Sequence, residues 1–311
     1  MARDVVLDVD TGTDDAVALL LAALHPALRL TGCTTSGGNL PVARTTDLTL
    51  RALEVAGRPD VPVHAGAEGP LVAGPHAWAT PAPQHPVDLP LPAATRAAGR
   101  GPAAAWLARH LRRGATTTAV VLGPATNLAT ALALDPGIVA GVEEVVLMGG
   151  GHPPGAAEHV AETNVGRDPW ATRAVLAAGF RRVTLVPLDA THRAPLTRDD
   201  AAGWAALGTA AGTAAAGLLG VLLGAAGTRG ARAGVPVHDA LCVAALADPA
   251  VLTTAEQVVT VGTDPDRWGA TTTRPPGPAE DAPPVRVAVD ADQAAFRAVL
   301  RAALSRGPAA R

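Results

Sequence analysis

Four aspartates fall within eight residues near the start of the chain. Asp8 and Asp10 belong to an apolar run typical of a strand, and Asp14 and Asp15 come just before an apolar segment typical of a helix. Four carboxylates that converge on one strand-to-helix junction repel one another, and protons or a cation must relieve that repulsion. Aspartate is the short carboxylate, which favours a compact cage of oxygens. The pattern therefore predicts a hard divalent cation in a catalytic cleft.

A helix N-terminus decorated with acids is the simpler alternative. Thr13 can cap the helix, and Asp14 and Asp15 are favourable in its first turn. This alternative accounts for one or two of the four acids. It does not account for Asp8 and Asp10 on the preceding strand.

The hydrophobic pattern predicts the elements that position these acids. Apolar strand-like runs alternate with helix-like segments along most of the chain, which predicts an α/β fold with an open, mostly parallel Rossmann-like sheet flanked by helices. Ligands of such sheets bind outside the carboxyl ends of the strands, so we expect the active site there. Strands are expected at 5–9, 30–35, 61–65, 117–122, 142–148, 182–187, 258–261 and 285–289, and helices at 16–24, 41–56, 103–112, 127–134, 168–178, 239–246 and 291–305.

The chain is expected to form a single domain, 1–311, because no linker, repeat or charge block divides it. A stretch rich in Pro, Ala and His predicts a mobile loop around 69–100. The uncharged stretch 204–228 is long enough to cross a bilayer, but it is mostly Ala, Gly and Thr. A lid-like helical region around 200–230 is therefore favoured over a membrane span.

The composition argues against other classes of protein. Hydrophobic residues make up 48% and charged residues 17%, so a sizeable core is available, and the formal net charge is -3. The lack of a basic stripe and the low aromatic content argue against a nucleic-acid-binding protein. Cys33 and Cys242 form neither a disulfide framework nor a zinc-ligand spacing. The chain enters its first strand without a signal segment, so a cytoplasmic protein is expected.

Three kinds of chemistry compete for the acidic junction. Asp8 and Asp10 resemble the first motif of haloacid-dehalogenase-like phosphatases, but those enzymes place a lysine beside the phosphate, and all 25 basic residues here are arginine. The same lack of lysine argues against a P-loop. A nicotinamide or flavin enzyme would carry Gly-x-Gly-x-x-Gly after the first strand, and this chain does not. Metal-assisted hydrolysis of a neutral substrate is the third alternative.

An ordered set of motifs supports that third alternative. The stretch Asp8-Val9-Asp10-Thr11-Gly12-Thr13-Asp14-Asp15-Ala16 resembles the signature of the inosine–uridine-preferring nucleoside hydrolases, or nucleoside N-ribohydrolases. Further stretches similar to that family follow in order: Gly38-Asn39, Leu122-Gly123-Pro124-Ala125-Thr126-Asn127-Leu128-Ala129, Val146-Leu147-Met148-Gly149-Gly150-Gly151, Ala161-Glu162-Thr163-Asn164 before Asp168-Pro169, and His238-Asp239-Ala240.

The resemblance implies calcium-dependent hydrolysis of the N-glycosidic bond of a ribonucleoside, giving ribose and free base. It implies a calcium ion held by oxygen ligands, which are Asp10, Asp15, Asp239 and the main-chain carbonyl of Leu122. Asp14 would be the general base that takes a proton from the metal-bound water. From the residues alone, a Gly-Pro after a strand, such as the one that follows Leu122, is usually just a turn.

The same resemblance implies the substrate contacts. Asn39, Glu162 and Asn164 would bind ribose hydroxyls, which amides and carboxylates suit because each hydroxyl both donates and accepts. His238 would be the acid for the leaving base, since an imidazole titrates near neutrality. His85 matches a family histidine near the base, although proline follows it where the family has glycine.

Each of these polar residues also has a structural interpretation. Asn39 can be a turn residue after two glycines. Glu162 and Asn164 can lie in a solvated loop before a helix. A lone histidine such as His238 is more often structural than catalytic.

Two departures from the family pattern concern the ribose pocket. The family often carries Gly-Asn where this chain has Gly155-Ala156, and often Phe where it has Thr163. Two other functions therefore stay open: a non-catalytic or weakly active ribose- or nucleoside-binding protein, and a hydrolase of a modified or non-standard riboside. The expected partner is a small-molecule nucleoside, with no nucleic acid and no membrane, and the expected assembly is a homodimer or homotetramer. Because tyrosine is absent, stacking on the base would need a histidine, Trp78, Trp204, Trp268 or Phe180.

Overall fold

A computed structural model describes residues 2–74, 88–112, 117–151, 161–227, 233–277 and 284–308 of the chain. The strands in these residues are β1 (Arg3–Val9), β2 (Leu28–Thr35), β3 (Val63–Ala65), β4 (Thr117–Val121), β5 (Val142–Met148), β6 (Val183–Val186), β7 (Leu252–Val261), β8 (Thr271–Arg274) and β9 (Val285–Ala291). They form one open sheet in the order β3-β2-β1-β4-β5-β6-β9-β7-β8. The strands from β3 to β9 in that order are parallel, and β7 and β8 complete the edge in antiparallel pairing. This is the mostly parallel α/β architecture that the hydrophobic pattern predicts.

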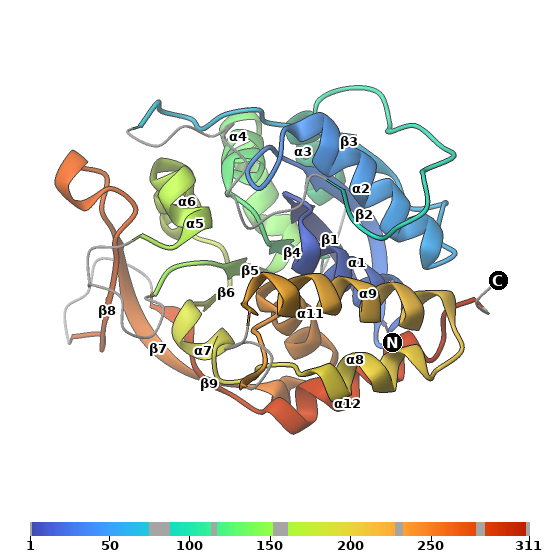
Figure 1. The fold of residues 1–311 in the computed structure, drawn as a ribbon. Helices are drawn as coiled ribbons and strands as arrows, with labels where there is room; N and C mark the ends of the chain where they lie inside the picture. The colour runs from blue at the N-terminus through green and yellow to red at the C-terminus, as the bar shows by residue number, and fades with distance from the viewer. Residues whose placement is uncertain are drawn as a thin grey trace.

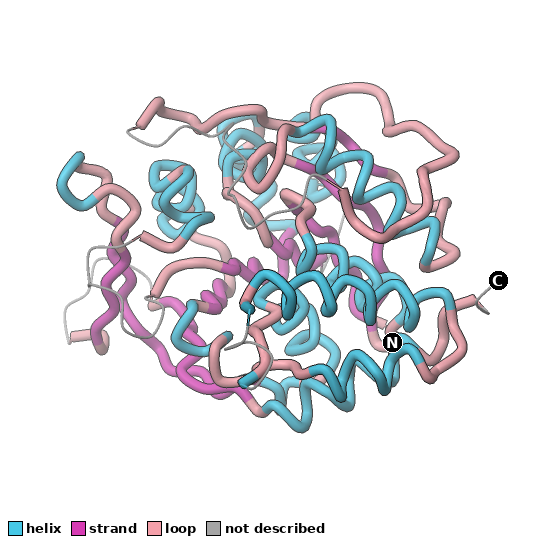
Figure 2. The backbone as a smooth tube through the Cα atoms, viewed as in Figure 1, coloured by secondary structure: helices cyan, strands magenta, loops and turns pink. Residues whose placement is uncertain are grey.

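Helices cover both faces of the sheet (Figure 1). The apolar cluster on one face contains side chains from α1 (Thr13–Leu24), α2 (Val42–Val55), α9 (Ala210–Ala225), α11 (His238–Ala247) and α12 (Gln293–Leu304). The cluster on the other face contains side chains from α3 (Ala103–Arg112), α4 (Thr126–Leu134) and α6 (Pro169–Ala177). Two short helices, α5 (Thr163–Arg167) and α7 (Leu188–Thr191), lie in the connections after β5 and β6. Figure 2 shows β7 and β8 extending away from the helical layers.

The first strand lies inside the sheet and contributes to both apolar clusters, because its side chains alternate between the two faces. Leu7 is buried in the cluster on the α1 side, whereas Val6 is buried in the cluster on the α3 and α4 side. Asp8 lies in register with Thr34 of β2 and with Val121 of β4. The carboxyl ends of three parallel strands therefore lie side by side, directly at the acidic stretch.

Several elements differ from the sequence-based expectation. The first helix begins at Thr13 rather than at residue 16, since the Asp15 carboxylate accepts from the Gly12 N–H and draws the acids into the first turn. The last helix begins at Gln293 rather than at 291 because Asp292 caps it. Neither β8, α5 nor the first half of β7 is predicted, since their short or polar sequences carry no apolar run.

Within residues 204–227, the uncharged stretch forms the end of α8 (Arg198–Ala205) and all of α9, so this part of the chain is helical. Helix α9 packs against α1, and its Leu218, Leu219 and Leu223 are buried. Within the described ranges, no helix is long and apolar enough to span a membrane. The role of this region as a lid stays a prediction.

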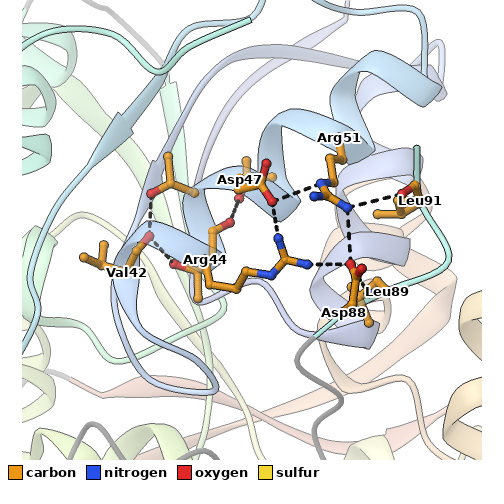
Figure 3. A network of polar contacts seen from close by, with 10 residues as sticks. Val42, Arg44, Asp47, Arg51, Asp88, Leu89 and Leu91 are labelled. Atoms are coloured by element: carbon orange, nitrogen blue, oxygen red, sulfur yellow. Dashed lines mark hydrogen bonds and ion pairs between the residues drawn. The ribbon is translucent and has the colours of Figure 1, made fainter. Parts of the chain in front are cut away.

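The C-terminal end of the loop expected at 69–100 is attached to α2 by charged groups (Figure 3). Asp88 accepts from Arg44 at 2.5 Å and from Arg51 at 3.2 Å, and Asp47 pairs with both arginines. The buried side chain of Leu91 adds an apolar contact. The loop therefore returns to the body of the protein at a defined point, while residues 75–87 lie outside the described part of the chain.

Candidate active site

Three acids meet where α1 and α11 begin. Asp14 and Asp15 lie in the first turn of α1, and Asp239 lies in the first turn of α11, which packs against α1. One carboxylate oxygen from each residue lies within 4.8 Å of the others. Asp15 and Asp239 are buried, whereas Asp14 is partly exposed. Segments from the two halves of the chain thus combine into one group of oxygens.

Asp10 lies next to this group, just after the end of β1, and is also buried. Its Oδ2 accepts a hydrogen bond from the Asn39 main-chain N–H at 2.8 Å and lies 3.0 Å from Nη1 of Arg167. The Asn39 side chain contacts both partners, because its Nδ2 lies 3.4 Å from Asp10 Oδ1 and its Oδ1 accepts from Arg167 at 3.2 Å. We use the term acidic cage for Asp10, Asp14, Asp15 and Asp239.

Asp8 supports the strand ends that carry the cage. Its Oδ1 accepts from Thr34 Oγ1 at 2.7 Å and from Asn127 Nδ2 at 2.8 Å. Asn127 also donates to the Thr35 carbonyl and accepts from the Ala67 N–H, so it connects β1, β2 and the segment after β3. The other oxygen of Asp8, Oδ2, is buried and has no hydrogen-bond partner within the described residues.

Burial makes these acids hard to ionise. It raises the pKa of Asp8 and of Asp10 to about 7, and it raises the pKa of Asp15 and of Asp239 well above the usual range. Repulsion between the acids acts in the same direction, whereas the Arg167 guanidinium lowers the pKa of Asp10. Oδ1 of Asp15 is buried without a donor in the described part of the chain. A group of buried, mutually repelling carboxylate oxygens with an unsatisfied acceptor fits a hard divalent cation.

The Leu122 carbonyl and α5 lie beside each other at the carboxyl edge of the sheet. Asn164 donates its Nδ2 to the Leu122 carbonyl at 2.7 Å, and the second lone pair of that carbonyl can still face a cation. Glu162 caps α5, and its carboxylate accepts from the main-chain N–H groups of Asn164 at 2.8 Å, Val165 at 3.0 Å and Gly150 at 3.2 Å. Glu162 and Asn164 are buried, so the alternative that places them in a solvated loop is wrong.

His238 opens α11 beside Asp239 and contacts two residues from the end of α7. Its Nδ1 lies 2.7 Å from Thr191 Oγ1, and its ring centroid lies 5.4 Å from that of His192. Burial lowers the pKa of His238 to about 4, while nearby Asp14 raises this pKa and His192 lowers it. The ring is therefore uncharged near neutral pH, in contrast to the expectation of an imidazole that titrates there.

The remaining residues selected from the sequence lie in different places. Trp204 and Phe180 are buried in the apolar clusters, which leaves neither of them for stacking on a base. Trp268 donates its Nε1–H to the Gly166 carbonyl at 2.8 Å and so contacts α5, where Thr163 is exposed. Three further residues lie outside the described part of the chain: Trp78, His85 and Ala156.

Sequence reasoning missed three residues that hold the site: Asn127, Arg167 and Thr191. Asn127 lies inside a family-like motif, and Arg167 directly precedes Asp168 of another. The position of both residues in or beside these motifs could have indicated that they belong to the site. Thr191 has no comparable signal, because its contact with His238 depends on how α7 and α11 pack.

Known proteins resemble this chain over most of its length. The family model described as inosine-uridine preferring nucleoside hydrolase matches residues 5–298. An uncharacterised protein of Schizosaccharomyces pombe is 36% identical over 196 residues, which cover 61% of this chain and 62% of that protein. The pyrimidine-specific ribonucleoside hydrolase RihA of Salmonella agona is 34% identical over 266 residues, or 85% of each protein. The solved purine-preferring ribonucleoside hydrolase from Gardnerella vaginalis has a TM-score of 0.87 at 28% identity, covering 97% of this chain and 98% of that one.

Proposed function

Because the chain belongs to the inosine-uridine preferring nucleoside hydrolase family and is therefore a hydrolase acting on N-glycosyl bonds, we propose that it releases ribose and a free base with calcium as cofactor and Asp14 as general base. The observation that carries this proposal is the acidic cage. Its carboxylates gather at the carboxyl edge of a parallel sheet, where ligands of this architecture bind.

Four oxygen ligands are proposed to hold the ion: the carboxylates of Asp10, Asp15 and Asp239 and the main-chain carbonyl of Leu122. Calcium binds oxygen ligands of this kind, with water and substrate hydroxyls completing its coordination. When bound, calcium would supply a Lewis acid that polarises a water and the ribose hydroxyls. The protein orients these ligands in advance, since the Gly12 N–H holds Oδ2 of Asp15 at 2.9 Å.

Asp14 is proposed as the base because it is the partly exposed member of the cage. It can accept a proton from a water while its buried neighbours stay bound to the ion. Positive charge develops on the ribose as the glycosidic bond breaks, and the carboxylates of the cage stabilise that charge. Attack by water in one step inverts the anomeric carbon.

His238 is proposed to stabilise the leaving base as a neutral imidazole: its Nε2–H donates a hydrogen bond to the departing base, the ring keeps its proton, and water supplies the proton that the base takes up. Thr191 has one hydroxyl hydrogen and two acceptors, the Leu188 carbonyl at 3.3 Å and Nδ1 of His238 at 2.7 Å. When the hydroxyl donates to Nδ1, the ring proton resides on Nε2, and this N–H can donate a hydrogen bond to the base. The proposal requires this tautomer, in which Thr191 donates to Nδ1 at 2.7 Å instead of to the Leu188 carbonyl at 3.3 Å.

The ribose contacts are proposed to use the groups that the fold leaves available. The Nδ2 of Asn164 is engaged by the carbonyls of Leu122 and Met148, which leaves its Oδ1 as an acceptor. Glu162 uses three of the roughly four lone-pair sites of a carboxylate on main-chain N–H groups, so one site remains for a hydroxyl.

The test is an assay for free ribose with uridine, cytidine, inosine, adenosine and nicotinamide riboside, in calcium and after chelation. We include purine and pyrimidine nucleosides because the two named hydrolases above differ in base preference. We expect release from at least one riboside in calcium, and loss of that release after chelation. Asp239→Asn should lower turnover by at least about 100-fold, whereas Asp199→Asn, an exposed acid on α8, should leave it unchanged.

Two results would contradict the proposal in different ways. Undiminished turnover after chelation would show that calcium is not the cofactor of the reaction. Tight nucleoside binding without ribose release under single-turnover conditions would reject hydrolysis of that nucleoside and favour a binding function.

A further inference from the structure

A positively charged side chain is built into the acidic cage. Arg167 is the last residue of α5, and its side chain is only 10% exposed. Its Nη1 contacts Asp10 Oδ2 at 3.0 Å and Asn39 Oδ1 at 3.2 Å. Charged side chains are rarely buried to this extent unless they are paired. The reaction proposed above assigns this arginine no role as ligand, base or acid.

The backbone around this ion pair is shaped to enclose it. Gly38 has a φ of +152°, and a Cβ at this position would collide with Asp10 Oδ2 and lie 3.0 Å from Arg167 Nη1. A Cβ at Gly123 would lie 3.0 Å from Asp10 Oδ1. Turns that follow β2 and β4 therefore close on the pair: a side chain at Gly38 would collide with it, and a side chain at Gly123 would require Asp10 to shift. The Asp10–Arg167 contact is thus part of the fold rather than one position of a surface side chain.

The pair also determines which oxygen of Asp10 is available. Oδ2 accepts from Arg167 and from the Asn39 main-chain N–H, whereas the contact of Oδ1 with Asn39 Nδ2 is long, at 3.4 Å. Oδ1 can therefore bind a cation without breaking the ion pair between Oδ2 and Arg167. Binding through Oδ2 would require the guanidinium to leave a buried position.

Arg167 changes the charge balance of the cage. The acids of the cage repel one another when they ionise, and the guanidinium offsets one of those charges. The same fixed positive charge repels an incoming divalent cation, and buried charges are screened less by salt than exposed ones. One residue therefore stabilises the ion-free cage and opposes its occupation.

We propose that Arg167 is a counter-cation of the acidic cage, which fixes Asp10 in the ion-free protein and lowers the affinity of the site for calcium below that of the four carboxylates alone. Occupation of the site then depends on the concentration of free calcium, and the ion exchanges instead of being trapped. Arg167 acts as a positioning residue, and the inference rests on the calcium site proposed above.

The test compares calcium binding by the ion-free, full-length protein and its variants, measured by calorimetric titration with calcium chloride. Arg167→Gln removes the charge and keeps a polar side chain, so its Kd for calcium should fall by about tenfold or more, which is about 1.4 kcal/mol. Its ion-free Tm should fall, and saturating calcium should raise its Tm more than that of the wild type. Arg167→Lys keeps the charge and should bind calcium within about threefold of the wild type, a difference of less than 1 kcal/mol.

The matched control is Arg173→Gln on α6, because Arg173 is exposed and contacts Thr263 rather than the acids. It should leave calcium binding and Tm unchanged. If Arg167→Gln folds only with calcium, release of calcium from the loaded protein into a fluorescent chelator replaces the titration. That release should be at least about tenfold slower than in the wild type, the same 1.4 kcal/mol expressed in the dissociation rate.

An unchanged or weaker calcium affinity in Arg167→Gln overturns the inference, because a merely structural arginine would lower Tm without tightening binding. Equal tightening in Arg167→Lys overturns it too, since charge would then not be the cause. Absence of calcium binding in every protein also overturns it. Ribose release from the same samples separates the two proposals: tighter binding without release rejects only the catalytic function, and calcium-dependent release with unchanged affinity rejects only the role of Arg167.

Discussion

Replacing Asp8 by asparagine tests the physical basis of the cage, because Asp8 is buried beside it and is not a proposed ligand. Burial raises the pKa of this carboxyl from its usual 3.8 to about 7. Between these values the folded protein keeps a proton that the unfolded chain releases, so the free energy of unfolding of the ion-free protein falls as pH rises. The difference corresponds to about 4 kcal/mol lost between pH 4 and pH 7.

An asparagine at position 8 cannot ionise, so the variant does not lose this free energy of unfolding as pH rises. It does introduce a smaller destabilisation of its own. Thr34 and Asn127 can still donate to its side-chain oxygen, but its NH₂ replaces Oδ2, which has no partner among the described residues. An unpaired buried donor costs about 1–3 kcal/mol. Asp8→Asn should therefore be less stable than the wild type by about 1–3 kcal/mol at pH 4, and more stable by a similar amount at pH 8.

Urea unfolding of the ion-free proteins from pH 4 to pH 8 measures both effects. The stability curves of Asp8→Asn and the wild type should cross, with slopes that differ by about 1.4 kcal/mol per pH unit between pH 4 and pH 7. Asp199→Asn, an exposed acid, should follow the wild type throughout. Parallel curves for Asp8→Asn and the wild type would refute the reasoning, since they would mean that Asp8 ionises in the folded protein as easily as in the unfolded chain.

Two further predictions concern the groups around the substrate. His238→Ala should lower kcat by roughly 10²–10³-fold for a nucleoside whose base is a poor leaving group, and far less for p-nitrophenyl riboside, whose leaving group is stable as an anion; equal losses on both substrates would exclude a role of His238 at the leaving group. Trp268→Phe removes the hydrogen bond to Gly166 on α5, so stability should fall by about 1 kcal/mol and KM should rise with little change in kcat. Urea unfolding measures the change in stability, and steady-state kinetics measures the change in KM. An unchanged KM would show that Trp268 stabilises the fold without affecting substrate binding.

The alternation of apolar runs was sufficient to predict the sheet and its helices, because each βαβ unit buries its own strand and helix faces. The edge of the sheet was harder to predict. Residues 252–257 of β7 pair with β9, and the polar strand β8 pairs with β7. Their sequences carry little apolar signal, and they become strands because neighbouring strands supply hydrogen-bond partners.

The candidate active site is likewise only partly predictable from the sequence. The order and types of the acids were visible in the sequence, and local rules place Asp14 and Asp15 in the first turn of a helix. The contact between Asp10 and Arg167 joins residues 157 positions apart, and it exists because α5 lies against the carboxyl end of β1. No local pattern reports such a contact, so the sequence alone does not predict the arginine that lies beside Asp10.

The amino-acid sequence is enough to identify the chemical groups of the site: short carboxylates, amides and a histidine, in an order that resembles one family of hydrolases. The ionisation state of those groups, in contrast, depends on how the chain folds. Asp8 and Asp10 are hard to ionise and His238 is held neutral because distant helices and strands exclude water from them. A side chain's charge depends on its solvation and its neighbours, and both come from packing between segments that are far apart in the chain.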